Sequence, residues 1–468
     1  MTTATWTRAA RGVARRFYSL PTLTPAFCHH ETTYPTVVTL SDALKGPPLT
    51  PYPKHPVFQT MTTSGDCLLP QTNNTDDRNS ETTNDILRKV LISMIRLRAF
   101  DETFKAAQRQ GRLSFFLESR GEEAAVVASA AALEPDDDIF SQYREHGALL
   151  WRGASFEALA HQCCGTRDDS AKGRQMPVHY GDRSRNFHTV SSPLATQLLH
   201  AVGFAYANKI KRMQSDACEE TQIESSPSPP SLSKPMSVVA CYFGDGTSSE
   251  GDFHAALNFA SILRCPVVFI CRNNGYAIST PTSQQFGGDG VVSRAEGYGM
   301  ASCRVDGGDS RAVYLATRAA RQHAVTTSRP ILLELMTYRL GDHSTSDDCR
   351  NYVPQGVLDR GEREGDPIGR LSRLLSATDA EQAAVRDAAV LEARQAIDLA
   401  SRTATPSVEI MFDDVYDDQG SQSCYELSRQ RRELLGGVGR GSHGDGGEVD
   451  DDEAVQVQVF VPETSGES

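Results

Sequence analysis

The sequence predicts an α/β fold with a central, mostly parallel sheet flanked by helices, and residues 237–280 carry the main observations. Two apolar runs, 237–243 and 266–271, have the length and composition of buried strands. An amphipathic helical pattern separates them, and Ser249 followed by Asp252 predicts its start. Two strands around one helix are typical of a βαβ unit, whose strands run parallel. In such sheets ligands bind beyond the carboxyl ends of the strands.

Polar residues follow both predicted strands. Asp245 stands between two glycines after the first strand, and Arg272 and Asn274 end the second. Because both strand ends meet at one edge of the sheet, we expect Asp245 and Asn274 to be neighbours. Their oxygens suit magnesium, and Arg272 suits phosphate. The joint pattern predicts a magnesium–diphosphate site, although each half alone is also found in ordinary turns.

Composition narrows the classes of protein. The chain has 468 residues, room for one large α/β domain or two smaller ones, and a formal net charge of −13. That charge, without a basic patch, argues against a nucleic-acid partner. No apolar run approaches the ~18 residues of a membrane span. The eleven cysteines contain no Cys-x-x-Cys pair, which favours a reducing compartment over a disulfide framework.

The two ends of the chain differ from its middle. Residues 1–30 are rich in Arg, Ser and Thr, with no acidic residue before Glu31, and this predicts a mitochondrial transit peptide. A basic disordered tail is the alternative. Residues 31–84 predict an irregular N-terminal arm. At the other end, 417–468 predict a C-terminal tail that becomes acidic and disordered.

Residues 85–416 are expected to form the folded domain, with C-terminal helices. Ser, Pro and Glu dominate 215–236, which predicts a disordered surface insertion within it. Hydrophobic periodicity predicts further helices at 85–111, 121–132, 198–213 and 311–325, and strands at 112–116, from Val305 and at 331–339.

Three longer motifs carry a resemblance to a known family. They are Gly173-Arg-Gln-Met-Pro-Val-His-Tyr-Gly181, Asn186-Phe-His-Thr-Val-Ser-Ser-Pro-Leu-Ala-Thr-Gln197 and Arg272-Asn-Asn-Gly-Tyr-Ala-Ile-Ser-Thr280. From about residue 56 to 416 the chain resembles the alpha subunits of mitochondrial branched-chain 2-oxo acid dehydrogenases. The first and third motifs favour this family over its pyruvate-specific relative.

The resemblance implies a thiamine-diphosphate-binding fold and assigns ligands. Magnesium would take side-chain oxygens of Asp245 and Asn274 and the carbonyl of Tyr276. Many relatives have Glu in place of Asp245, and either carboxylate serves a hard cation. Ser192 and Leu194 would lie beside the middle of the cofactor. The remaining implied cofactor contacts are Gln142, Tyr143, Arg144, Gly244, Arg272 and His343.

The resemblance also implies a potassium site, a catalytic histidine and a regulated serine. The potassium ligands would be Ser191, Pro193, Thr196 and Gln197, although a polar turn capped by Thr196 is physically sufficient there. His343 would assist acyl transfer to a lipoyl arm, for which a charge switch near neutral pH is suited. Asp342 stands where relatives often have His, and the direction of its effect on the His343 pKa is open. Ser344 matches an inhibitory phosphorylation site, and Pro354 stands where a second site would be.

The partners follow from what the sequence lacks. No second pyrimidine-binding domain is present, and in the family a beta subunit supplies the activating carboxylate. The resemblance therefore implies an α2β2 heterotetramer in the mitochondrial matrix, serving a lipoyl-bearing transacylase core and regulated by a kinase and a phosphatase. It would act on branched-chain 2-oxo acids such as 3-methyl-2-oxobutanoate. The alternatives are a pyruvate dehydrogenase alpha subunit, a self-sufficient thiamine diphosphate decarboxylase and a non-catalytic scaffold.

Overall fold

Seven strands form one sheet in the order β1-β8-β9-β5-β4-β2-β3, and every neighbouring pair is parallel. This confirms the predicted α/β class. The computed structural model describes residues 54–68, 77–223, 237–408, 410 and 429–430, with backbone only at 77–82 and 216–223. The strands are β1 (Val57–Phe58), β2 (Asp138–Phe140), β3 (Phe187–His188), β4 (Val239–Gly244), β5 (Val267–Asn273), β8 (Ala301–Asp306) and β9 (Ile331–Met336).

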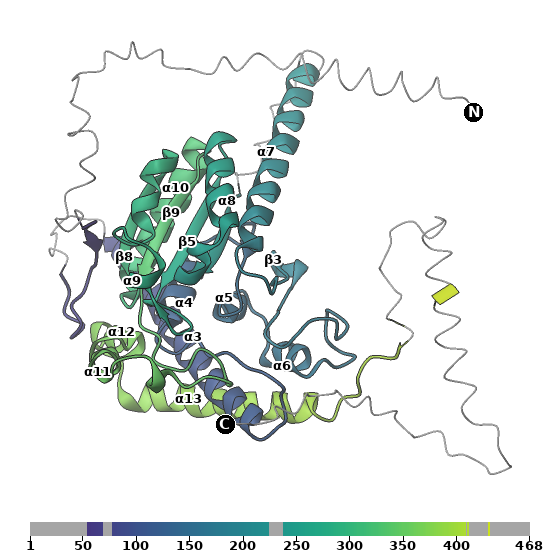
Figure 1. Ribbon diagram of the computed structural model, residues 1–468, viewed down its shortest axis with the longest axis vertical. Coiled ribbons are helices and arrows are strands. Elements are labelled where there is room, and N and C mark those ends of the chain that lie inside the picture. The colour runs from purple at the N-terminus through teal and green to yellow at the C-terminus, as the bar shows by residue number, and fades with distance from the viewer. Residues whose placement is uncertain (1–53, 69–76, 224–236, 409, 411–428, 431–468) are drawn as a thin grey trace. The chain divides into compact units, whose positions relative to one another are not determined.

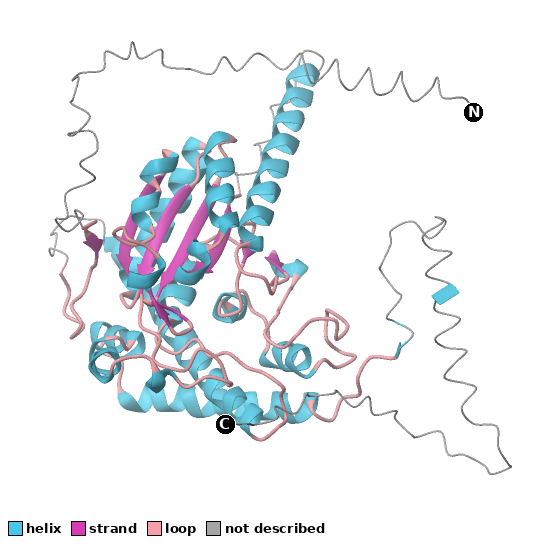
Figure 2. Cartoon of the chain, viewed as in Figure 1, coloured by secondary structure: helices cyan, strands magenta, loops and turns pink. Residues whose placement is uncertain are grey.

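A separate antiparallel pair joins β6 (Tyr276–Ala277) to β7 (Thr280–Pro281). Helices lie around the parallel strands (Figures 1 and 2). They are α3 (Asp77–Arg109), α4 (Glu123–Ala131), α5 (His146–Trp151), α6 (Phe156–Cys164), α7 (Thr196–Ile223), α8 (Gly251–Ile262), α9 (Thr282–Gln285), α10 (Ser310–Thr327), α11 (Gln355–Glu364), α12 (Pro367–Leu375) and α13 (Asp379–Ala400).

Alternate residues of β4 divide the core into two layers. Ala240 and Tyr242 belong to one buried cluster with residues of α3, α4, α10 and α13. Cys241 and Phe243 belong to a second cluster with residues of α7 and α8. Since successive side chains of a strand point to opposite faces, both faces of the sheet are covered by helices. Buried strands of this kind carry continuous apolar runs, which is the pattern of the sequence.

Helix α4 is the most enclosed helix of the first layer. All its residues from Glu123 to Ala130 are buried, and most are Ala or Val. The small side chains allow close contact with α3, α5 and α10. The Ser129 hydroxyl also lies 2.8 Å from the Tyr242 hydroxyl on β4. These contacts fix α4, the helix that begins at Glu123, against the sheet and its neighbouring helices.

Two helices are longer than expected. Helix α3 begins at Asp77, inside the predicted arm 31–84, and α7 continues to Ile223, inside the predicted insertion 215–236. No Pro or Gly occurs in 77–84 or in 215–223, so nothing in either segment breaks a helix once packing has started it. The transit segment 1–30 and nearly all of the tail 417–468 lie outside the described residues.

The strand predicted at 112–116 and the cap predicted at Ser249 are wrong. The backbone N–H of Phe116 donates to Thr345 Oγ1 at 3.2 Å, and its carbonyl accepts from Thr345 N at 3.1 Å. The segment therefore pairs with a distant loop and joins no sheet. Ser249 lies in a 3-10 turn (Asp245–Ser249), and α8 begins after Glu250 without a side-chain cap. No helix in the described part of the chain is long and apolar enough to cross a membrane.

Candidate active site

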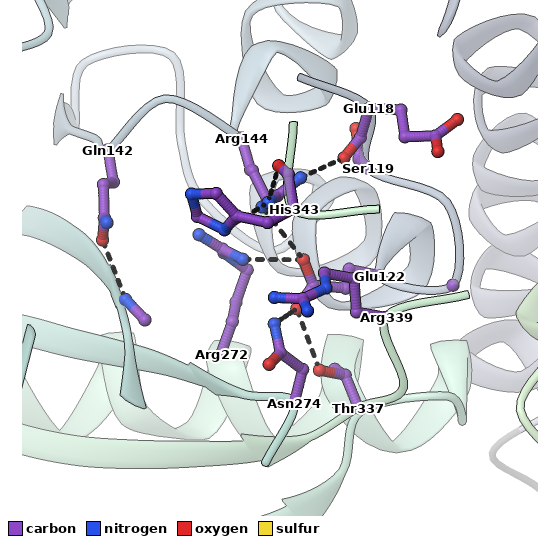
Figure 3. A network of polar contacts seen from close by, with 12 residues as sticks. Glu118, Ser119, Glu122, Gln142, Arg144, Arg272, Asn274, Thr337, Arg339 and His343 are labelled. Carbon is purple, nitrogen blue, oxygen red and sulfur yellow. Dashed lines mark hydrogen bonds and ion pairs between the residues drawn. The ribbon is translucent and has the colours of Figure 1, made fainter. Parts of the chain in front are cut away.

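Four neighbouring strands bring the predicted site residues to one edge of the sheet. Strands β9, β5, β4 and β2 are adjacent, and their carboxyl ends lead to His343, Asn274, Asp245 and Gln142 respectively. Figure 3 shows most of these side chains together with Arg144 and Arg272. The βαβ pattern of the sequence predicted that Asp245 and Asn274, which follow β4 and β5, lie at this edge. The structure adds the segments that follow β2 and β9.

Asp245 and Asn274 are neighbours, which confirms the prediction from the βαβ pattern. Gly244 of β4 is in register with Arg272 of β5, and the backbone of Asn274 is close enough to the Asp245 carboxyl to act to lower its pKa. Burial raises the pKa of Asp245, and the nearby Glu122 adds to this effect. A buried carboxyl with a second carboxylate nearby favours a bound cation.

The Tyr276 hairpin packs tightly against the Asp245 turn. A Cβ on Gly246 would lie 2.7 Å from Ala277 Cβ, so only glycine allows this approach. Ile278 at the hairpin tip has φ 55°, a strained backbone value for a β-branched residue. Strain of this kind is concentrated at ligand-binding sites. On its other side, Tyr276 lines a small pocket together with Arg339 and residues of α11.

Arg272 is buried between two carboxylates. Its Nη1 donates to Glu122 Oε2 at 2.8 Å, and its Nε donates to Glu145 Oε1. Glu122 also accepts from Asn274 Nδ2 at 3.0 Å and from Thr337 Oγ1 at 3.1 Å. Burial acts to raise the pKa of Glu122, but Arg272, Arg144 and these hydrogen bonds bring it below its ordinary value.

Arg144 is a buried cation without a close carboxylate among the described residues. Its Nη1 donates to the Glu118 carbonyl at 2.5 Å, and its Nη2 donates to the His343 carbonyl. Its ion pair to Glu122 is long, 3.9 Å from Nε to Oε2. Burial lowers the Arg144 pKa below its usual range. An anion placed beside this guanidinium would offset that cost, so the site suits a phosphate group.

His343 lies beside Arg144 and Tyr143. Its Nδ1 is 3.2 Å from Arg144 Nη2, and its ring meets the Tyr143 ring edge-on at 5.9 Å. Burial, then Arg144 and Arg339, lower its pKa from 6.5 to about 3. In the chain by itself the imidazole is therefore neutral at neutral pH, and the charge switch in the assembled enzyme stays a prediction. Asp342 is engaged elsewhere, 3.5 Å from Lys105 Nζ.

The residues before and at the start of α7 form a second polar group. The Ser192 hydroxyl is 2.6 Å from His179 Nε2, and Leu194 is partly buried. Val178, next to His179, is buried with φ 64°, another strained position. The group adjoins β4, since Gln197 Nε2 donates to the Tyr242 carbonyl at 3.2 Å.

Within this group three of the four predicted potassium ligands, Ser191, Pro193 and Thr196, contact one another. Thr196 Oγ1 donates to Ser191 Oγ at 2.8 Å and to the Pro193 carbonyl at 3.0 Å. Gln197 Oε1 is buried and has no hydrogen-bond partner among the residues that the structure describes. A buried oxygen without a partner is costly unless a cation or water occupies the space. These oxygens therefore fit a cation.

The predicted magnesium site contains few carboxylates. No group of three or more His, Cys, Asp or Glu that could hold a metal occurs in the described residues. The expected set of Asp245, Asn274 and the Tyr276 carbonyl needs only one carboxylate, which is typical of magnesium beside phosphates.

Ser344 lies in the half-buried loop that follows His343. Its Oγ accepts from Ser346 N at 3.2 Å, and its carbonyl accepts from Asp347 N at 3.1 Å. Pro354, which stands where the resemblance implied a second phosphorylation site, is the N-cap of α11.

Sequence reasoning missed Glu122, Glu145, Thr337 and Arg339 as members of the site. Glu122 and Glu145 are the N-cap residues of α4 and α5, yet neither makes a side-chain cap bond. A signal for Glu122 was available, because two acidic residues, Glu122 and Glu123, stand at the start of a helix that otherwise consists of Ala, Val and Ser and must be buried. Nothing comparable marks Thr337.

The chain also matches a known protein family. The family described as "Dehydrogenase E1 component" matches residues 92–410, and the chain belongs to this family of thiamine diphosphate-dependent 2-oxo acid dehydrogenases. The family is consistent with a thiamine-diphosphate-binding fold.

Individual relatives are more specific. The 2-oxoisovalerate dehydrogenase subunit alpha 2, mitochondrial, of Arabidopsis thaliana is 46% identical over 70% of this chain and 66% of its own length. The human 2-oxoisovalerate dehydrogenase subunit alpha, mitochondrial, is 42% identical over 81% of the chain and 79% of its length. The Caenorhabditis elegans protein of the same name is 46% identical over 69% of each. The chain thus spans about two thirds of the plant and nematode relatives.

The lowered pKa of His343 predicts a dependence of stability on pH. The unfolded chain binds a proton at His343 near pH 6.5, whereas the folded chain does so only near pH 3. Stability conferred by the neutral ring is therefore lost as pH falls from 6.5 towards 3. His343→Asn should reduce the loss of unfolding free energy between about pH 7 and about pH 5, measured by urea denaturation.

The exposed His200 provides the control. His200→Asn should retain the wild-type difference in unfolding free energy between about pH 7 and about pH 5. An unchanged difference in His343→Asn would show that His343 is not held neutral.

Proposed function

We propose that this chain is the alpha subunit of a mitochondrial branched-chain 2-oxo acid dehydrogenase. With a beta subunit it would decarboxylate branched-chain 2-oxo acids and pass the acyl group to a lipoyl arm. The pairing of Asp245 with Asn274 beside two buried arginines carries this proposal. Relatives named 2-oxoisovalerate dehydrogenase alpha subunits support the choice of substrate.

The cofactor site is assigned from the fit of its residues. Asp245, Asn274 and the Tyr276 carbonyl would hold magnesium, and Arg144 and Arg272 would face the diphosphate. Gln142, Tyr143, Gly244 and His343 complete this end of the site. The buried Asp245 carboxyl and the absence of a short ion pair at Arg144 within the described residues support the assignment.

Thiamine diphosphate, when bound, supplies the electron sink that decarboxylation requires. The chain itself positions groups around it. Because Arg144 Nη2 donates towards His343 Nδ1, the neutral imidazole carries its proton at Nε2. His343 would thus offer a donor N–H towards the reacting region. Leu194 and Ser192 would contact the middle of the cofactor, on the side of β4 and α7.

The potassium site is the second metal proposal. Gln197 Oε1 without a partner and the oxygens of Ser191, Pro193 and Thr196 support it. Bound there, a cation would fix the turn that leads from Ser192 and Leu194 into α7.

The proposed partners explain an exposed apolar surface. Phe259 and Ile262 on α8 are 52% and 73% exposed, and Tyr206 and Met213 on the adjacent α7 are also exposed. Apolar patches of this kind mark protein interfaces. We assign the surface to assembly of an α2β2 heterotetramer, which would serve a lipoyl-bearing transacylase core in the matrix. A kinase and a phosphatase acting on Ser344 and a transit peptide at 1–30 complete the proposal.

The metal assignment predicts a loss of cofactor binding. Asp245→Ala or Asn274→Ala, in the chain assembled with a beta subunit, should weaken magnesium-dependent binding of thiamine diphosphate by at least about 100-fold. Asp252→Ala, an exposed carboxylate on α8, is the control and should bind normally. Titration calorimetry measures the affinity. Wild-type affinity in both variants would remove the assignment.

The partner assignment predicts that the chain alone is inactive. Adding the beta subunit should produce turnover of 3-methyl-2-oxobutanoate and, by light scattering, a particle of about four chains. Greater turnover of pyruvate would favour a pyruvate dehydrogenase alpha subunit. Substantial turnover without the beta subunit would favour the self-sufficient decarboxylase.

Regulation through Ser344 predicts sensitivity to charge. Phosphate would add about −1.5 to −2 charges next to a site built for an anion, so repulsion should follow. Ser344→Glu should lower activity of the complex at least about tenfold, although Glu carries less charge. Ser346→Glu, two residues on and exposed, should change it little. Equal activity in the two variants contradicts a regulatory role of this position.

A further inference from the structure

Glu122 forms hydrogen bonds with three residues of the site, Arg272, Asn274 and Thr337. We propose that Glu122 is a positioning residue, which orients the Asn274 amide so that its oxygen faces the divalent cation. This inference rests on the proposed magnesium site and adds the group that prepares it.

Three hydrogen bonds fix the Glu122 carboxylate. Oε1 accepts from Asn274 Nδ2 at 3.0 Å and from Thr337 Oγ1 at 3.1 Å, while Oε2 accepts from Arg272 Nη1 at 2.8 Å. The donors come from the ends of β5 and β9, and the Glu122 side chain is 1% exposed. With both oxygens engaged and water excluded, the carboxylate has one orientation (Figure 3).

An ionised carboxylate only accepts hydrogen bonds, and this determines which end of Asn274 faces it. The amide nitrogen must point to Glu122, because an amide oxygen there would meet a second acceptor at short range. Asn274 Oδ1 then points to the opposite side, where it accepts from Tyr276 N at 3.1 Å. That side holds the hairpin packed against the Asp245 turn. The oxygen needed for magnesium is thus presented by a group that is not itself a ligand.

Glu145 offers a matched comparison. It binds the same guanidinium through Oε1, and its Oε2 accepts from Gln142 N at 2.8 Å. No hydrogen bond between Glu145 and Asn274 occurs in the described part of the chain. Glu122 and Glu145 therefore each pair with Arg272, and only Glu122 contacts the amide of Asn274.

The test compares Glu122→Gln with Glu145→Gln in the chain assembled with a beta subunit. Gln keeps the shape of Glu but also offers a donor, so both orientations of Asn274 become acceptable. The magnesium concentration for half-maximal thiamine diphosphate binding is measured by calorimetry. It should rise about 10–100-fold in Glu122→Gln and by a clearly smaller factor in Glu145→Gln, because the latter variant keeps the hydrogen bond between Glu122 and Asn274. Thermal midpoints without ligand should fall similarly, because each variant removes one partner of Arg272.

A third variant keeps the test decisive if Glu122→Gln does not assemble. Thr337→Val removes one donor from Glu122 Oε1 without changing charge, and it should raise the magnesium requirement by a smaller factor, about 3–10-fold. Equal shifts in Glu122→Gln and Glu145→Gln, or no shift in Glu122→Gln, overturn the inference. If only Thr337→Val is measurable, no shift there overturns it. Wild-type binding that ignores magnesium would instead refute the proposed function.

Discussion

The buried ion pairs of Arg272 are the interaction on which the site depends. Its guanidinium joins β5 to the segments before α4 and α5 through Glu122 and Glu145. Removing one partner of a buried pair leaves an uncompensated charge and costs about 3–5 kcal/mol. The carboxylates also stand at helix N-termini, where the backbone N–H groups favour negative charge. Three segments distant in sequence are therefore held in one arrangement before any ligand binds.

The two arginines of the site differ in their charge environment. Arg272 is neutralised within the chain, whereas Arg144 donates mainly to carbonyl oxygens and has only a long contact to Glu122. Burial lowers the pKa of Arg144, and burial also lowers the pKa of His343 and keeps its ring neutral. An incoming diphosphate would change the surroundings of both groups together. The charge state of His343 in an assembled enzyme therefore depends on what occupies the site.

Local pattern was enough to predict the sheet and the Asp245–Asn274 contact, because strand periodicity and parallel connection rules act over short distances. Glu122 and Glu145 escaped prediction because their partners lie far along the chain, and a glutamate before a helix usually caps it in solvent. The extensions of α3 and α7 were missed because polar composition does not itself end a helix. The segment 112–116 was misassigned because its strand-like residues pack in an aromatic cluster beside Phe100 and Phe104.

The pairing of that segment with the loop after β9 has a mechanical consequence. Thr345 both accepts a hydrogen bond from the backbone N–H of Phe116 and donates one to its carbonyl. Leu340 N donates to the Arg120 carbonyl at 3.1 Å. Between these points, the Glu118 carbonyl holds Arg144. The loop that contains His343 and Ser344 is thus hydrogen-bonded at both ends to residues 116–120, the segment that precedes Glu122. A displacement of this loop would therefore also displace the backbone at Glu118, whose carbonyl accepts a hydrogen bond from Arg144. The loop and Arg144 are expected to move together.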